Sequence, residues 1–506
     1  MSYIQLIQEE KRVVNHEGAL AYKMSAEAEL YTTVCTMALQ PKFYESTPEQ
    51  IDRVAKLIPK VSPEFVAQLA IYARQEMLLR SVPLLLIVEL AKVHCGDNLV
   101  SNAIEKVILR ADEITELLRC YQWRNPKEGV KKLSYLSHQV QKGLQRAFNK
   151  FDEYQFAKYN RSKKDISLRD ALFIVHPKAV NKEQQLLFDK IANNTLEVPY
   201  TWETELSALG QNSYATSEER THIFAEKWTE LINSGKLGYM ALLRNLRNII
   251  SIGIDEGTLR IVANRIANVQ EIAKAQQLPF RYLSAYKEIK NVDSANTPVI
   301  LTALEQAALA SASNVHGFSA NSKVMIACDM SGSMMSSLSA RGKVKYYEIG
   351  LVLAMLLQNN CHRVVTGIFA DEFEVVNLPQ TSILESAYAI RQMIGKVGYG
   401  TDGNKPLEWL IEKGEIVDKV VYFTDCQFWE NDYWGNRIAQ LWTLYKKISP
   451  TAHLYLFDLA GYGHVPIQTG QQDITMISGW SDRIFDMLQA IENEKDILKK
   501  IHCIEL

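Results

Sequence analysis

A short segment offers oxygen ligands for a metal ion at the end of an apolar run. In "KVMIACDMSGSMMSSL", residues 323–338, five apolar residues lead into Asp329, and Ser331 and Ser333 follow at alternate positions. One carboxylate and two hydroxyls are hard oxygen donors, which Mg²⁺ binds at about 2.1 Å while it keeps several waters. The segment therefore predicts a divalent-cation site in the loop after a buried strand.

Two further oxygen donors follow other predicted elements. Thr401 lies in the glycine-rich segment "GYGTDG", and Asp425 ends the apolar run "VVYFTDC". The carboxyl ends of parallel strands meet at one edge of a sheet, where ligands bind. We expect Mg²⁺ at this edge, with Mn²⁺ as the alternative ion. The alternative interpretation is a polar loop that caps helices. The predicted metal ligands are Asp329, Ser331, Ser333, Thr401 and Asp425.

The composition of this ligand set favours docking over catalysis. If Asp329 alone binds directly and Asp425 acts through water, the ion stays under-neutralised and takes a carboxylate or a phosphate from a partner. No His or Cys nucleophile with a paired base stands beside the segment, so we expect no enzyme activity. Metal-assisted hydrolysis is the alternative. A phosphatase of the haloacid dehalogenase type needs a carboxylate where Ser331 stands.

The second part of the chain has the pattern that positions such a loop. Apolar strands alternating with helices predict a doubly wound, mostly parallel α/β sheet. The expected strands are 323–329, 363–370, 419–425 and 453–459, and the expected helices are 345–358, 385–395, 406–414 and 481–493.

The first part, from about residue 25 to 310, carries helix signals. Thr47 as N-cap, followed by Pro48 at the first helical position and Glu49 in the first turn, is typical of a helix start. The segment 62–64 repeats this pattern, with Ser62 as N-cap. Short links between many helices predict an all-α body of stacked helical repeats. The composition turns small and polar at residues 311–321, so we expect two domains, 1–318 and 319–506.

Bulk composition excludes several classes of protein. The longest apolar run, 82–91, is too short for a membrane span, and the first residues have no apolar signal core. Seven scattered cysteines without a C-x-x-C pair favour reduced thiols in a cytoplasmic protein. The net charge of −2 indicates no chain-wide attraction to nucleic acid.

A local basic segment departs from that average. Residues 124–169 contain twelve Lys or Arg against four acidic residues, with aromatic residues between them. Cations neutralise phosphates, and aromatic faces stack unpaired bases. The alternative is a solvated helix face whose aromatic residues belong to the core.

The sequence resembles a known family over nearly its whole length. The order D-x-S-x-S, then Thr, then Asp resembles the metal-ion-dependent adhesion site of von Willebrand factor A domains. Several segments of the helical part resemble the TROVE domain of Ro ribonucleoproteins, and the pairing of the two domains is the Ro architecture. These segments are "HEGALAYKMSAEAELYTTV", "LAIYARQEMLLRSVPLLLIVELA", "KFDEYQFAKYNRSKKDISLRDALFIVHPK", "TWETELSALGQNS" and "GKLGYMALLRNLRNI".

The resemblance implies a HEAT-like helical ring that binds RNA in two ways. Ro proteins bind small noncoding Y RNAs on the outer surface and single-stranded 3′ ends of misfolded RNAs through the hole. The family's Y-RNA contacts match Lys158, Arg161 and His176, although the spacing is shorter here. For that reason Lys163 or Lys164 is the alternative to Arg161. Arg169 belongs to the same basic segment.

Arg244 and Arg247, in "LLRNLRN", fall on one helical face and are expected either to line the hole or to form surface ion pairs. The predicted function is that of a noncoding-RNA scaffold in RNA quality control or decay. The resemblance also implies a monomeric ring and an exoribonuclease partner such as polynucleotide phosphorylase. The alternative function is a metal-dependent module that docks an acidic protein ligand and binds no RNA.

Overall fold

The computed structural model describes most of the chain. The described residues are 12–37, 39, 45–126, 136–160, 166–312, 318–319, 321–338, 344–379, 382–429, 437–468, 473–480, 485, 488 and 497–506. They fall into two compact units, of which the first joins residues 1–51 to 213–499 and the second joins 52–212 to 500–506. These two units are defined by contacts between residues in space. The domains 1–318 and 319–506 were predicted from composition, and the domain boundary at residue 318 stays a prediction.

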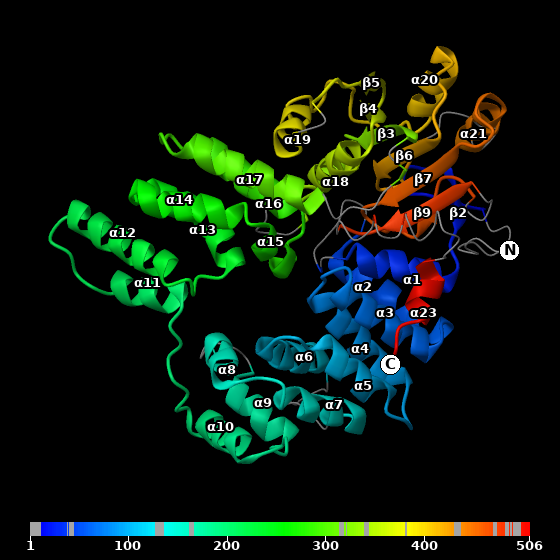
Figure 1. Cartoon of the computed structure of the whole chain (residues 1–506). Helices are drawn as coiled ribbons and strands as arrows, with labels where there is room; N and C mark the ends of the chain where they lie inside the picture. Colours follow the sequence, from blue (N-terminus) through cyan, green and yellow to red (C-terminus); the bar gives the residue numbers. More distant parts are fainter. Residues whose placement is uncertain are drawn as a thin grey trace. The chain divides into compact units, whose positions relative to one another are not determined.

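The first unit contains a six-stranded sheet in the order β5-β4-β3-β6-β7-β9. All neighbours pair in parallel except β4 and β5. The strands are buried because both faces carry helices: α18 contacts β3 and β6, and α20 contacts β4 and β5 (Figure 1). The strands are β3 (Lys323–Asp329), β4 (Arg363–Phe369), β5 (Phe373–Val375), β6 (Lys419–Thr424), β7 (His453–Asp458) and β9 (Ile474–Ser478).

The predicted doubly wound sheet is confirmed, with additions. The four expected strands form its centre, and β5, β9 and α21 were not expected. Of the expected helix 481–493, the structure describes only Phe485 and Leu488, which are helical and buried. The helices of this region are α18 (Tyr346–Asn360), α19 (Leu384–Arg391), α20 (Lys405–Lys413), α21 (Arg437–Ile448) and the short η2 (Ser333–Met335).

A second sheet joins the start of the chain to its end. β1 (Arg12–Val14) and β2 (Leu20–Lys23) form a hairpin, and β2 pairs antiparallel with β8 (His464–Val465). These strands precede residue 25, where the predicted helical part begins, and they were not expected. Gly18 has φ of +82°, which a tight hairpin turn requires and which residues with a Cβ rarely adopt. The helix α1 (Ala26–Cys35) then contacts β9.

The rest of the first unit is helical. Its helices are α12 (Ser217–Asn233), α13 (Tyr239–Ile252), α14 (Glu256–Ile266), α15 (Val269–Ala275), α16 (Phe280–Lys290) and α17 (Thr297–Ala312). α16 and α17 also contact α18, so these helices share a core with the sheet.

The second unit is built from stacked helices, with the C-terminal α23 (Ile497–His502) at its limit. The helix α2 (Thr47–Leu57) crosses the division after residue 51. The other members are η1 (Ile58–Lys60), α3 (Pro63–Gln75), α4 (Ser81–Val93), α5 (Leu99–Val107), α6 (Ala111–Arg124), α7 (His138–Phe148), α8 (Glu153–Tyr159), α9 (Leu168–Val175), α10 (Lys182–Asn193) and α11 (Trp202–Gly210). α3 packs against α4 and α5, α4 packs against α6, and α5 packs against α7. Closure into a ring stays a prediction.

The helix starts follow the capping chemistry of the sequence. Ser62 caps α3 as expected, because its hydroxyl accepts a hydrogen bond from the backbone N–H of Phe65. The expected N-cap Thr47 is wrong by one residue. The Ser46 hydroxyl is bonded to Glu49, and these bonds lower the pKa of that exposed carboxyl. No helix of the described residues is long and apolar enough to cross a membrane.

Candidate metal site and nucleic-acid surface

The opening motif forms a buried loop at the carboxyl edge of the sheet. Asp329 ends β3, and its Oδ1 accepts a hydrogen bond from the Ser331 N–H at 2.9 Å. Its Oδ2 accepts one from the Thr424 hydroxyl at 2.6 Å. The hydroxyls of Ser331 and Ser333 lie 3.2 Å apart. All three predicted donors of the motif are buried, so the structure brings them together at the expected place.

Asp425 follows the neighbouring strand β6 and is also buried. Its Oδ1 accepts a hydrogen bond from the Gln427 N–H at 3.1 Å, and its Oδ2 makes no hydrogen bond of normal geometry with the described residues. Burial raises the pKa of this carboxyl, and the negative charge of Asp329 raises it further. Burial also raises the pKa of Asp329, although the Ser331 and Thr424 hydrogen bonds partly offset it.

Thr401 reaches the same place on the glycine-rich loop between α19 and α20. Thr401 and Ser333 line one pocket of about 240 Å³. The Gly332 N–H donates to the carbonyl of Tyr399 at 2.8 Å, and the Trp429 N–H donates to the carbonyl of Thr401 at 2.7 Å. These backbone bonds tie the glycine-rich loop to the loops that follow β3 and β6.

Asp371, which the sequence reasoning missed, holds the glycine-rich loop in place. Its Oδ2 accepts a hydrogen bond from the Tyr399 N–H at 2.9 Å. A Cβ on Gly398 would lie 1.9 Å from that oxygen, and a Cβ on Gly400 would lie 2.1 Å from Oδ1. Only glycine lets the backbone wrap the carboxylate so closely. The sequence could have predicted a role for Asp371, because this residue follows the predicted strand 363–370 just as Asp329 and Asp425 end their predicted strands.

Glu17 is the second residue that was missed. It follows β1 in the hairpin turn and lines the pocket together with Ser333 and Thr401. The turn is anchored beside the site, since the Asn15 amide donates to the carbonyl of Phe428 at 2.8 Å. The His16 N–H donates to the Gln427 side chain at 3.1 Å. No local sequence pattern could predict that the hairpin turn lies beside the site, because more than 400 residues separate the hydrogen-bonded partners.

The five residues fit a hard divalent cation. Two buried carboxylates in mutual repulsion are costly without a cation between them, and the Asp425 Oδ2 lacks a hydrogen bond among the described residues. The remaining donors are hydroxyls, which suit Mg²⁺ or Mn²⁺ rather than a soft metal. No described group of three or more His, Cys, Asp or Glu forms another site. Metal binding here stays a prediction.

The predicted RNA contacts of the second unit lie on α8 and α9, which both pack against α6. Lys158 is exposed in the last turn of α8, and its ammonium lies 5.7 Å from the ring centroids of both Tyr154 and Tyr159. Arg169 is exposed on α9, with its guanidinium 5.6 Å from the centroid of Phe173. Tyr154 and Phe173 are 48% and 51% exposed, so these rings are not core residues.

His176 ends α9 in the left-handed backbone region, with φ of +49°. Its imidazole is exposed, while its carbonyl accepts a hydrogen bond from the Gln145 side chain at 3.2 Å. The backbone of His176 therefore ends the helix, while its exposed imidazole is accessible to a ligand. The structure describes none of the three other predicted contacts of this segment, Arg161, Lys163 and Lys164.

Arg244 and Arg247 belong to α13 of the first unit, and both are exposed. Arg247 forms an ion pair with Glu288 at 3.2 Å, which agrees with the alternative of a salt-bridged surface for this residue. Arg244 lies close enough to Arg281 to lower the pKa of that guanidinium, after the larger effect of its burial. Two neighbouring cations attract anions. Whether they line a hole stays a prediction.

Comparison with known proteins covers both parts of the chain. The family model of the TROVE domain matches residues 17–198 and 193–316, and that of the Ro60 vWA domain matches residues 323–489. The crystal structure of the Deinococcus radiodurans Ro (Rsr) protein matches 93% of this chain and all of its own, with 18% identity and a TM-score of 0.58.

Telomerase protein component 1 of Rattus norvegicus is 24% identical over 331 residues, and that of Mus musculus is 24% identical over 329. Each match covers 49% of this chain but only 12% of the relative, so the chain spans a small part of those proteins. The two domain matches together extend from residue 17 to 489, in the order of the Ro architecture. The chain therefore belongs to the Ro family, with a TROVE domain followed by a von Willebrand factor A domain.

Proposed function

We propose that the protein is an RNA-binding ribonucleoprotein component that holds a small structured noncoding RNA on the surface of α8 and α9. Family membership supports the class of ligand. The observation that carries the location is the set of exposed cations, because neither Lys158 nor Arg169 forms an ion pair with a described residue. Each lies over an aromatic ring instead. Such pairs offer charge to phosphates and ring faces to unpaired bases.

The role proposed for this binding is that of a scaffold in RNA quality control or decay. A Y-like RNA on the outer surface and single-stranded 3′ ends of misfolded RNAs are the proposed ligands. The protein would act as a cytoplasmic monomer that presents RNA to an exoribonuclease such as polynucleotide phosphorylase. It would supply binding and no catalysis.

The test is to purify the protein from its own cells and sequence the RNA that accompanies it. We expect one small structured RNA to dominate and to be lost from the variant Lys158→Ala/His176→Ala. A control variant, Lys60→Ala/His222→Ala, removes an exposed lysine and an exposed histidine elsewhere and should keep the RNA. If no RNA is enriched over background at low salt, the basic segment is a solvated face and the proposal is wrong.

A second function is favoured by the buried site, namely metal-dependent docking of an acidic ligand. Asp329, Ser331, Ser333, Thr401 and Asp425 would hold Mg²⁺ or Mn²⁺, and the ion would supply a Lewis acid that captures an anionic group of a partner. The buried Asp425 Oδ2, which makes no hydrogen bond of normal geometry with the described residues, carries this proposal. Equilibrium dialysis with Mn²⁺ should show one site that Asp329→Ala removes. Unchanged binding in that variant would refute the assignment.

A further inference from the structure

The helix that carries Lys158 is too short to be stable by itself. α8 has seven residues, whereas isolated helices shorter than about 12–15 residues are marginal in water. Its packing against α6 therefore decides where its exposed side chains lie. The start of α8 is also held by an ion pair at 2.6 Å between Glu153 and Lys190 of α10. Its last turn, which presents Lys158, depends on a different contact.

That contact comes from Arg110, the N-cap residue of α6. Its guanidinium lies 4.6 Å from the ring centroid of Tyr159, the last residue of α8. The Lys158 ammonium lies 5.7 Å from the centroid of the same ring. A planar guanidinium stacks on an aromatic face, which the compact ammonium of a lysine does not do. The Tyr159 ring therefore connects Arg110 to the cation on which the proposed RNA surface depends.

A buried carboxylate fixes Arg110 in turn. The Arg110 Nε and Nη2 donate to the two carboxylate oxygens of Asp112, each at 3.2 Å. Asp112 is buried, and it also accepts a hydrogen bond from Arg80. This bidentate pair neutralises Arg110, whereas Lys158 forms no ion pair with a described residue. Of the two cations beside the ring, Lys158 is therefore the one that retains its charge for a phosphate.

We propose that Arg110 is a positioning residue of the RNA surface, which acts through the Tyr159 ring to hold Lys158 where it meets a phosphate. The inference rests on the proposed RNA binding by α8 and α9, and it adds a residue that lies outside the basic segment 124–169. Because Asp112 occupies the Arg110 guanidinium, a change of Arg110 should alter RNA affinity only while Lys158 is present.

The test is a double-mutant cycle, measured at low salt by filter binding of a stem–loop RNA with a single-stranded 3′ tail. Arg110→Lys keeps the charge but loses the planar stack, so binding should weaken about twofold to fivefold, as the loss of one exposed cation–π contact allows. In the Lys158→Ala background the same change should have no further effect, because the two residues act as one unit.

Two variants of Tyr159 repeat the test without touching the Arg110–Asp112 pair. Tyr159→Leu should weaken binding as Arg110→Lys does, whereas Tyr159→Phe keeps the ring and should retain the wild-type affinity. The matched control is Arg265→Lys on α14. Arg265 forms an equivalent bidentate pair with Glu271, at 3.0 and 2.9 Å, and its replacement should leave RNA affinity unchanged.

The contrary outcomes separate this inference from the proposed function. An equal loss of affinity on Arg110→Lys in the wild-type and Lys158→Ala backgrounds overturns the inference, because Arg110 then acts independently of Lys158. Unchanged binding in Arg110→Lys and Tyr159→Leu overturns it as well, and so does a loss that Tyr159→Phe shares with Tyr159→Leu. Absence of RNA binding by the wild type, or unchanged binding in Lys158→Ala alone, refutes the proposed surface itself.

Discussion

At the scale of single residues, the site depends on carboxylates with different tasks. Asp329 and Asp425 are buried side by side, and each raises the cost of ionising the other. Asp371 lies on a neighbouring loop and is not one of the predicted ligands, but it fixes the loop that carries Thr401. Substitutions of Asp425 and Asp371 can therefore distinguish the loss of a metal ligand from the loss of a residue that positions the Thr401 loop.

Replacing Asp425 by Asn should have opposite effects on the two states of the protein. Burial and the charge of Asp329 raise the pKa of the Asp425 carboxyl to about 8, so its ionisation above that pH costs free energy that the neutral amide avoids. The metal-free melting temperature measured above pH 8 should therefore rise by about 2 °C. The rise that Mg²⁺ produces in the wild type should disappear, because a ligand is lost. Differential scanning calorimetry with and without Mg²⁺ measures both effects. Asp52→Asn, on an exposed position, is the control and should change neither.

Asp371→Ala should weaken metal binding at least tenfold without removing any ligand. The hydrogen bond from the Tyr399 N–H to this carboxylate is charge-assisted, and such bonds contribute about 1.5–3 kcal/mol. Asp371→Asn keeps an acceptor and should retain most of the affinity. Titration calorimetry with Mn²⁺ distinguishes the two. If the alanine and asparagine variants lose the same affinity, the charge and not the position of the loop is what matters.

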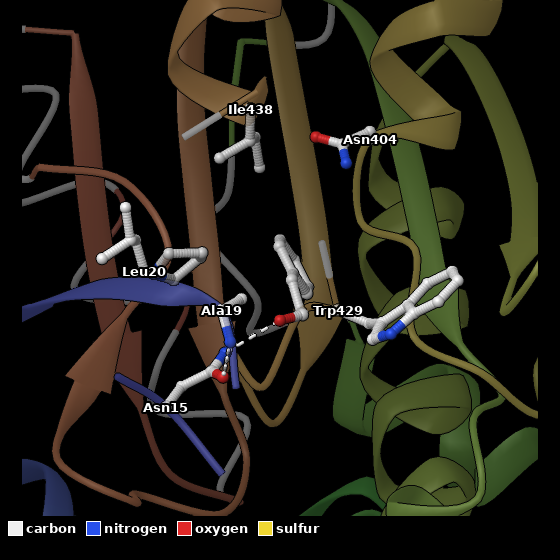
Figure 2. Close-up of a pocket in the computed structure, with 8 residues that line it drawn as sticks. Asn15, Ala19, Leu20, Asn404, Trp429 and Ile438 are labelled. Carbon is white, nitrogen blue, oxygen red and sulfur yellow. Dashed lines mark hydrogen bonds between the residues drawn. The ribbon is translucent and has the colours of Figure 1, made fainter. Parts of the chain in front are cut away.

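At the scale of elements, the N-terminal hairpin is the part that ties the start of the chain to the metal site. The Asn15 side chain bonds both to the hairpin turn and to the loop after β6. Its Oδ1 accepts hydrogen bonds from the N–H groups of Glu17 and Ala19 inside the turn, and its Nδ2 donates to the carbonyl of Phe428. The pocket around Asn15 also contains the Asn404 side chain, whose oxygen has no hydrogen-bond partner among the described residues (Figure 2).

Asn15→Asp should release the hairpin from the site while it preserves the turn. The carboxylate still accepts the two N–H groups of the turn, but it presents an acceptor to the carbonyl of Phe428, and a buried acceptor left unpaired costs about 1–3 kcal/mol. Hydrogen exchange of residues 12–23 should accelerate. Asn15→Ala should accelerate it further, since the turn bonds are lost as well. Equal exchange in both variants and the wild type would show that β2 and β8 hold the hairpin alone.

At the scale of the whole molecule, the net charge conceals a strongly basic segment. The chain carries −2 overall, while the basic segment 124–169 has an excess of eight positive charges. Affinity that comes from phosphate neutralisation falls with salt, and the slope counts the contacts. The exposed cations of α8 and α9 therefore predict a salt dependence that is specific to the second unit.

Lys158→Gln/Arg169→Gln should reduce the slope of log K against log salt by roughly 1.5, because each lost phosphate contact contributes about 0.7–0.9. Filter binding of a stem–loop RNA with a single-stranded 3′ tail, between 50 and 200 mM KCl, measures it. The control Lys60→Gln should leave the slope unchanged. Equal slopes in the double variant and the wild type would exclude phosphate contact by these two side chains.

The local sequence pattern was sufficient to predict the central sheet. It was also sufficient to predict that the five proposed metal ligands lie at one edge of that sheet. Each of them lies at or just after a strand or in a glycine-rich loop, where residue type and periodicity carry the information. Glu17 and the pairing of β2 with β8 depend on contacts across more than 400 residues, and strands as short as β8 have no periodicity to read. Asp371 could have been predicted from its position directly after the strand 363–370.

The pairing of Tyr22 with Val465 has a consequence for biosynthesis. The hairpin leaves the ribosome before its partner strand, which follows only after more than 400 further residues have been translated. At about 5–20 residues per second, the edge of β2 waits roughly 20–90 s without its neighbour. An unpaired strand edge recruits other strands, so we expect residues 20–23 to need protection until β8 has been translated.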